Sequence, residues 1–212
     1  DFLNTKIKNR SEIISLTNIP ILAMIPRSDH KSNLVVFDRP QSTVAESFRV
    51  LRSKISYYTN DIDKRGKVIM VTSSIPGEGK TFTSINLASA LSLNEEKTIL
   101  VGLDLRKPKI IDDFDLNNNF GVSSYLSGIS KNMDEIIQHS GFDNLDIISA
   151  GPIPPNPSEL INRQKFVEFI SSLKEKYKNI IIDTPPIMLV ADSLQIAKHV
   201  DVTIYMCRYN YT

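Results

Sequence analysis

The sequence predicts an α/β fold in which a doubly wound, mostly parallel sheet is flanked by helices. From residue 66 onward, short runs of β-branched apolar residues alternate with longer amphipathic stretches. The runs are almost continuously apolar, which is typical of parallel strands that helices cover on both faces. Helices that connect consecutive parallel strands produce a doubly wound sheet.

The elements follow from this alternation in chain order. The predicted strands span residues 67–72, 98–103, 145–149, 179–182 and 202–206. The predicted helices span residues 81–93, 133–139, 164–177 and 192–199. Four prolines between residues 152 and 157 argue against a helix or a central strand there, because proline has no backbone N–H to donate. We expect this stretch to connect two elements or to shape the wall of a site.

The first 42 residues are expected to form an N-terminal segment that packs on a core of residues 43–212, in a single domain overall. Residues 19–26 are apolar and bracketed by prolines, which predicts an edge strand. Residues 27–42 are polar and predicted to be loop. Thr43 and Glu46 fit a capping box, so we expect a helix to begin at Thr43.

This helix is expected to have two distinct faces. At about 100° per residue, one face collects the apolar side chains, which are Val44, Phe48, Leu51 and Ile55. Glu46, Arg49 and Arg52 form a second stripe, turned roughly 130° from the first. We therefore expect the charged stripe to point away from the core, either as a solvated face or as a contact surface.

Composition argues against several classes of protein. The 25 Lys and Arg residues nearly balance the 24 Asp and Glu residues, so no bulk charge favours nucleic acid as a partner. No run approaches the ~20 apolar residues that a membrane-spanning helix needs. The single cysteine, Cys207, cannot form an internal disulfide, which favours a reducing compartment. Because the chain opens without Met, we expect it to be cut from a longer protein.

The most informative segment is the loop between the first predicted strand and the helix after it. It carries Gly77 and Gly79, where the absence of a side chain lets backbone N–H groups approach a phosphate. Lys80 can reach the β and γ phosphates, and the Thr81 hydroxyl can ligate Mg²⁺. Ser74 stands where the strict GxxxxGK(S/T) pattern has glycine. The strand–loop–helix context nevertheless predicts a P-loop.

Two aspartates at predicted strand ends support this interpretation. Asp104 and Asp183 each follow an apolar run, and ligands of open parallel sheets sit beyond the carboxyl ends of the strands. Mg²⁺ prefers one or two carboxylates together with phosphate oxygens. The predicted metal ligands are therefore Thr81, Asp104 and Asp183. The nearby Arg106 is a candidate catalytic cation for transferred charge, or part of a solvated face.

These residues together resemble the cytoplasmic domain of the bacterial tyrosine kinases, and the resemblance covers nearly the whole chain. Residues 73–81 resemble the Walker A loop of that family, residues 104–108 the end of its Walker A′ motif, and residues 180–186 its Walker B motif. Glu46, Arg49 and Arg52 match its ExxRxxR motif. That motif implies contacts between subunits of a ring.

The resemblance implies an ATP-dependent protein tyrosine autokinase, with ATP or ADP and Mg²⁺ as cofactors. Subunits of a homo-oligomer would phosphorylate one another on a C-terminal tyrosine cluster, expected beyond Thr212. The domain would lie at the cytoplasmic face of the bacterial inner membrane, after a membrane-spanning and periplasmic part of the same polypeptide. Its further partners would be the polysaccharide polymerisation and export machinery and a cognate tyrosine phosphatase. The implied catalytic residues are Lys80, Asp104, Asp183 and Arg106, and the implied nucleotide-binding residues are Gly77, Glu78, Gly79, Lys80, Thr81, Phe82 and Arg208.

Two alternatives to a kinase remain, and the first comes from a departure from the family. The first Walker A′ aspartate, thought to act as catalytic base, is Gly102 here. A positioned base contributes typically 10²- to 10⁴-fold in rate, so the chain could instead be a nucleotide-gated oligomerisation module with little kinase activity. The second alternative, a partitioning-type ATPase, needs an early loop lysine, and this chain has Ile75 there.

Overall fold

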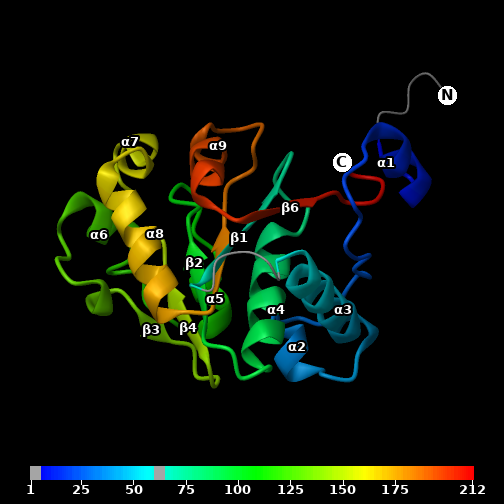
Figure 1. Ribbon diagram of the computed structural model, residues 1–212, viewed down its shortest axis with the longest axis horizontal. Helices are drawn as coiled ribbons and strands as arrows, with labels where there is room; N and C mark the ends of the chain where they lie inside the picture. Colours follow the sequence, from blue (N-terminus) through cyan, green and yellow to red (C-terminus); the bar gives the residue numbers. More distant parts are fainter. Residues whose placement is uncertain (1–5, 60–64) are drawn as a thin grey trace.

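The computed structural model describes residues 6–59 and 65–212 and contains one six-stranded sheet (Figure 1). The strand order is β3-β4-β2-β5-β1-β6. The strands are β1 (Lys67–Ser73), β2 (Thr98–Gly102), β3 (Gln138–His139), β4 (Leu145–Ile148), β5 (Asn179–Asp183) and β6 (Val202–Met206). All neighbouring pairs are parallel except β3 with β4. The predicted mostly parallel sheet is confirmed, and each predicted strand matches to within one residue at either end.

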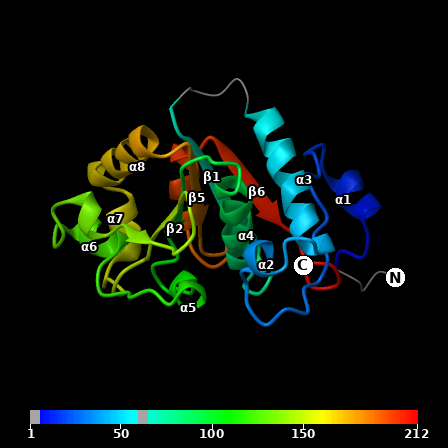
Figure 2. The same ribbon diagram turned by 90° about the horizontal axis from the view of Figure 1, so that it is seen from below.

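Helices cover both faces of this sheet (Figure 2). The α-helices are α1 (Arg10–Leu16), α2 (Val35–Asp38), α3 (Thr43–Tyr58), α4 (Lys80–Ser92), α5 (Ile110–Phe114), α6 (Val122–Ser127), α7 (Pro157–Ile161), α8 (Gln164–Lys176) and α9 (Asp192–Ile196). Two 3₁₀ helices, η1 (Met133–Glu135) and η2 (Ala197–His199), complete the described elements. Among the helices of residues 6–59 and 65–212, none combines the length and the apolar character that crossing a bilayer requires.

The apolar core lies in two layers, one on each side of the sheet. On one side α2, α3 and α4 pack against the strands, with Phe48 and Ile85 fully buried. On the other side α6, α7, α8 and α9 pack, with Phe166 and Phe169 fully buried. Burying one such side chain stabilises the fold by about 1.5–3 kcal/mol. The central strands β1 and β5 are therefore covered on both faces, which explains their continuous apolar sequence.

The structure corrects the predictions for the N-terminal segment. Residues 19–26 form no strand, and they contact the core through partly buried Leu22, Ala23 and Ile25. Pro20 and Pro26 have no N–H to give to a strand ladder, and the segment packs on the core through its side chains. Residues 27–42 are not all loop, because their apolar residues 35–37 lie in α2. The division of the chain at residues 42 and 43 stays a prediction.

A second correction concerns residues 133–139, which were predicted to be one helix. They contain η1 and then β3, which pairs antiparallel with β4 through Gln138 and His139. The segment is too short for apolar periodicity to separate helix from strand, and pairing with the sheet edge decides the outcome.

The cap of one helix and the start of another also differ from expectation. Ser42, not Thr43, caps α3 by accepting a hydrogen bond from the Ala45 N–H at 3.1 Å. The helix still begins at Thr43. Helix α7 starts within the proline-rich stretch, with Pro157 as its first residue. Proline suits that position because the first N–H of a helix has no intrahelical partner.

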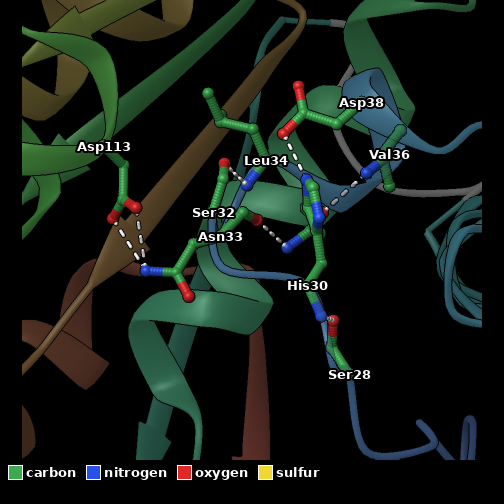
Figure 3. A network of polar contacts seen from close by, with 9 residues as sticks. Ser28, His30, Ser32, Asn33, Leu34, Val36, Asp38 and Asp113 are labelled. Atoms are coloured by element: carbon green, nitrogen blue, oxygen red, sulfur yellow. Dashed lines mark hydrogen bonds and ion pairs between the residues drawn. The ribbon is translucent and has the colours of Figure 1, made fainter.

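A buried polar network fastens residues 28–38 to α4 and α5 (Figure 3). The Asn86 amide group donates to the carbonyl oxygens of Asn33 at 2.6 Å and Phe82 at 2.8 Å. Its side-chain oxygen accepts from the Val36 N–H at 3.0 Å. The Asn33 side chain points to Asp113 of α5, with both contacts at 2.9 Å. One buried side chain therefore satisfies three backbone groups of two separate segments.

We expect Asn86→Ala to lower the free energy of unfolding by about 2–4 kcal/mol, because it leaves the buried Val36 N–H without its partner. Urea denaturation measures this change. Asn94→Ala, at an exposed position just after α4, is the control and should stay within about 0.5 kcal/mol of wild type. Equal stabilities of the two variants would show that the network does not hold residues 28–38.

Candidate functional site

The loop between β1 and α4 has the backbone that a phosphate-binding loop needs. Gly77 and Gly79 have φ angles of 86° and 98°, in the left-handed region where side chains are strained. Gly79 caps the 13-residue helix α4, whose first residue is Lys80. The free N–H groups and the dipole at this helix start attract anions. Loop and helix together form a candidate anion site at the carboxyl end of the central strand β1.

The Asp183 carboxylate is buried at the tip of β5, beside that loop. One carboxylate oxygen accepts a hydrogen bond from the Thr81 hydroxyl at 2.8 Å, and the other accepts from Ser84 at 3.1 Å. Burial raises the pKa of Asp183 to about 6, although both hydrogen bonds and Lys80 oppose the rise. The sequence predicted Thr81 and Asp183 to meet, and they do. Ser84 was missed, although its spacing of three from Thr81 places both on one helix face.

Lys80 is 8% exposed. Its positive charge balances the carboxylates of Asp183 and Asp104. Its burial lowers its pKa, while Asp183, then Asp104, then Glu78 raise it. The structure therefore brings together the predicted cation and both predicted aspartates. Asp104 is held in a tight turn, where its carboxylate accepts the N–H groups of Arg106 at 3.3 Å and Lys107 at 3.0 Å.

The residues present fit a bound Mg²⁺ ion. Thr81, Asp104 and Asp183 offer a hydroxyl and two carboxylates; the Thr81 hydroxyl contacts Asp183, and both carboxylates act on the pKa of Lys80. Within residues 6–59 and 65–212, no group of three or more His, Cys, Asp or Glu side chains is arranged to hold a metal alone. A small ligand set suits Mg²⁺, which keeps waters and takes substrate phosphate oxygens to complete its octahedron.

Arg106 has partners of its own at the edge of this site. Its guanidinium donates to Asp192 at 3.1 Å and to Ser158 at 3.1 Å. The Ser158 hydroxyl donates to Asp192, which is buried, at 2.5 Å. The predicted catalytic cation thus ties the Asp104 turn to α7 and α9. Asp192 is the first residue of α9, and its ion pair with Arg106 was not predicted.

Gly102 lies in β2 directly beside Asp183 of β5. A Cβ atom at residue 102 would come 3.3 Å from the Ala150 nitrogen and 3.4 Å from Ile110 Cδ1. The first separation is slightly tighter than ordinary van der Waals contact, and the second stands at its lower limit. Ile110 therefore lies beside the place where the side chain of the missing aspartate would begin, at a small cavity that is also lined by Asp104, Lys109 and Asp183.

The remaining predicted nucleotide residues play different parts. The buried Glu78 carboxylate accepts the Ile75 N–H at 2.8 Å and so closes the loop on itself. The Phe82 ring packs against Phe48 with centroids 5.8 Å apart, so its side chain serves the core. Arg208 donates to the Gly77 carbonyl at 2.6 Å, from the turn after β6.

The charged stripe of α3 lies off the core, as its helical angle indicates. Glu46 is exposed and pairs with Arg49 at 2.8 Å. Arg52 reaches across to α4 and donates to the Ala90 carbonyl at 2.6 Å. Glu46 and Arg49 therefore present charge to the outside, while Arg52 also joins two helices of the same chain.

Comparison with known proteins identifies what these features resemble. The AAA domain family matches residues 66–211. Tyrosine-protein kinase YwqD of Bacillus subtilis is 37% identical over 76% of this chain and 67% of its own length. Tyrosine-protein kinase etk of Escherichia coli is 30% identical over 91% of this chain, but that match spans only 24% of its length. The kinase domain of the E. coli enzyme superposes with a TM-score of 0.86 at 28% identity, covering 93% of this chain and 81% of that chain.

More distant P-loop proteins share part of the fold. The septum site-determining protein MinD of Pyrococcus horikoshii, complexed with Mg-ADP, has a TM-score of 0.58 at 25% identity, covering 66% of this chain and 57% of its own. The common part confirms the predicted P-loop class of α/β fold. The superposition on the kinase domain extends over far more of the chain.

The buried Asp183 carboxylate should make the stability of the protein depend on pH. Its pKa rises on folding from 3.8 to about 6, so ionisation costs the fold about 3 kcal/mol above pH 6. The cost shrinks as the pH falls through 6 and vanishes below about pH 4. We expect Asp183→Asn, which keeps one of the two acceptor oxygens and removes the charge, to stabilise the protein by up to about 3 kcal/mol at pH 8 and by about half as much at pH 5.

Chemical denaturation at the two pH values measures this difference. Asp143→Asn removes an exposed carboxylate and serves as the control, with no pH-dependent gain expected. A gain for Asp183→Asn that does not change with pH would contradict the buried ionised carboxylate.

Proposed function

We propose, from the premise that this chain belongs to the bacterial tyrosine kinase family of AAA-domain P-loop proteins, that it transfers the γ-phosphoryl group of ATP to tyrosine. The observation that carries the proposal is the contact of Thr81 with the buried Asp183 beside Lys80, at the mouth of a glycine loop. Phosphoryl transfer depends mainly on positioning and on charge stabilisation, and these residues supply both.

Each residue would have a defined part in binding MgATP. The N–H groups of the loop around Gly77 and Gly79 would hold the phosphate oxygens, and Lys80 would place its charge between the β and γ phosphates. Thr81, Asp183 and Asp104 would hold the metal, which would neutralise charge on those phosphates. Because Asp183 must be ionised for this task, nucleotide binding with Mg²⁺ should weaken below about pH 6.

The acceptor would be a tyrosine hydroxyl of a neighbouring subunit. Its oxygen would form the new bond to the γ-phosphorus as the bond to ADP breaks, and its proton would leave to solvent. Gly102 supplies no carboxylate to receive that proton. The transition state of phosphoryl transfer is loose, with little need for the hydroxyl to be deprotonated early. The reaction would therefore proceed without a positioned aspartate, but more slowly.

We further propose the cellular setting that the family resemblance implies. The domain would act at the cytoplasmic face of the bacterial inner membrane, joined to a membrane-spanning and periplasmic part of the same polypeptide. Subunits would form a ring through Glu46, Arg49 and Arg52 and phosphorylate a C-terminal tyrosine cluster. A cognate phosphatase would reverse the modification and so regulate polysaccharide polymerisation and export. A curated relative from Klebsiella pneumoniae is named as a putative tyrosine kinase of a cps region, which agrees with this setting.

Mass spectrometry of the intact protein tests the kinase activity. After incubation with Mg²⁺ and ATP, the full-length protein should gain phosphotyrosine. Lys80→Met should reduce the rate at least about 100-fold, because the phosphates lose their buried point charge. Lys131→Met, which removes an exposed lysine, should leave the rate unchanged. Wild-type protein that stays unlabelled would overturn the kinase proposal.

The second candidate function is a nucleotide-gated oligomerisation module with little catalysis. The specific observation in its favour is Gly102, which supplies no carboxylate and has the apolar Ile110 beside it. Under this proposal MgATP would bind at the same loop and control assembly of subunits. It predicts oligomers that depend on nucleotide in the absence of phosphotyrosine.

Light scattering tests assembly through the α3 stripe. We expect Glu46→Lys to shift the protein towards monomers in the presence of MgATP, because the substitution reverses an exposed charge and leaves the Arg52 contact with Ala90 in place. Lys54→Glu, an exposed charge reversal elsewhere on α3, is the matched control. Equal oligomer sizes for both variants would remove α3 from the assembly surface.

A further inference from the structure

We propose that Arg208 and Tyr211, in the turn after β6, position the phosphate-binding loop by holding its outward carbonyl groups. The inference rests on the proposed nucleotide site and adds two residues to it. Both side chains are positioning residues, because they touch the loop from outside. The sequence predicted Arg208 to bind the nucleotide, and here we propose that it acts through the loop.

The two side chains grip consecutive residues of the loop. The Arg208 guanidinium donates to the Gly77 carbonyl at 2.6 Å, and the Tyr211 hydroxyl donates to the Pro76 carbonyl at 3.0 Å. The guanidinium carbon also lies 5.0 Å from the centre of the Tyr211 ring, so each side chain supports the other. A Cβ atom on Gly77 would come 2.8 Å from the Tyr211 hydroxyl. Glycine at residue 77 thus serves this contact as well as the left-handed backbone.

Peptide geometry links the hydrogen bonds on the loop carbonyl groups to the direction of the next N–H groups. In a planar trans peptide the carbonyl of one residue and the N–H of the next point in opposite directions, and the described residues contain no cis peptide bond. With the carbonyl groups of Pro76 and Gly77 held outward, the N–H groups of Gly77 and Glu78 point into the loop. A donor on the carbonyl also polarises the peptide and strengthens its N–H as a donor. Both effects prepare these two amides for phosphate oxygens.

The turn that carries both side chains is itself anchored. The Arg208 N–H donates to the Thr212 hydroxyl oxygen at 2.7 Å, and the Thr212 N–H donates to the Arg208 carbonyl at 3.0 Å. Ile7 pairs with both Thr212 and Asn210 through backbone hydrogen bonds of 2.9 and 2.8 Å. Figure 1 shows the red end of the chain beside the blue N-terminal stretch. Arg208 and Tyr211 therefore contact the loop from a turn that is held in place by hydrogen bonds.

A further contact joins the same turn to the loop. The Thr212 hydroxyl contacts the Glu78 carboxylate, whose other oxygen accepts the Ile75 N–H. The Tyr205 hydroxyl of β6 lies 2.5 Å from the Ser74 hydroxyl. The stretch from β6 to Thr212 thus contacts the loop along its length, where Ser74 replaces the glycine of the strict motif.

Calorimetric titration with MgADP and with AMP tests the inference. We expect Tyr211→Phe and Arg208→Ala each to raise the dissociation constant for MgADP about fivefold, because each removes one exposed hydrogen bond to the loop. The affinity for AMP should change less than about twofold, because AMP has no β phosphate for the loop to hold. Arg208→Lys should fall between wild type and Arg208→Ala. Tyr209→Phe removes an exposed phenol of the same turn and should bind like wild type.

Amide NMR supplies a readout that a merely structural role would not move. The Gly77 and Glu78 N–H signals of wild type should shift downfield when MgADP is added, and both shifts should shrink in Tyr211→Phe. The unfolding temperature without nucleotide should stay at the wild-type value in Tyr211→Phe and Arg208→Lys.

The outcomes separate this inference from the function on which it rests. Wild-type protein that does not bind MgADP would overturn the proposed nucleotide site and the inference with it. Wild type that binds MgADP, beside Arg208 and Tyr211 variants that bind equally well, would overturn the inference alone. Equal losses of MgADP and AMP affinity would also contradict it, because they would mean general damage to the fold.

Discussion

The site depends on one buried carboxylate placed beside one buried ammonium group. Asp183 stands at the tip of β5, where burial disfavours its charge, and Lys80 stands at the start of α4, where burial disfavours the opposite charge. The opposite charges lower the cost of burying each other, and Thr81 and Ser84 donate hydrogen bonds to the Asp183 carboxylate. The Asp183 carboxylate can still bind a cation, and the Lys80 ammonium group can still bind an anion. A metal–phosphate complex supplies both at once.

The sheet topology explains why these groups meet. β5 lies between β1 and β2, so its tip is flanked by the glycine loop after β1 and by the Asp104 turn after β2. Residues far apart in the sequence then share one edge, as the rule for ligand sites in open parallel sheets requires. The same edge receives support from outside: Arg106 ties the Asp104 turn to α7 and α9, and Arg208 holds the loop from the turn after β6. The Asn33 contact with Asp113 adds a link from residues 28–38 to α5, the helix that carries Ile110.

The parts of this account that the sequence predicted rest on strong local signals. Continuous apolar runs located β1, β2, β4, β5 and β6, and the spacing from Gly77 to Thr81 located the loop, because both patterns are set by neighbouring residues. The wrong predictions concern segments whose structure depends on contacts with residues far away in the sequence. Residues 19–26 look like a strand but find no ladder partner. Residues 133–139 look like one helix, but only 133–135 are helical and residues 138 and 139 pair with β4. The hydrogen bond from Arg208 to Gly77 spans 131 positions, and no local pattern announces it.

A crystal structure of the protein grown with Mg²⁺ and ADP would test the central claim most directly. The account predicts a diphosphate inside the Gly77–Gly79 loop, with its β phosphate against the Lys80 ammonium group. The metal should touch the Thr81 hydroxyl and face Asp183 and Asp104. A nucleotide bound elsewhere, or a diphosphate in the loop with its metal remote from Asp183, would contradict the account.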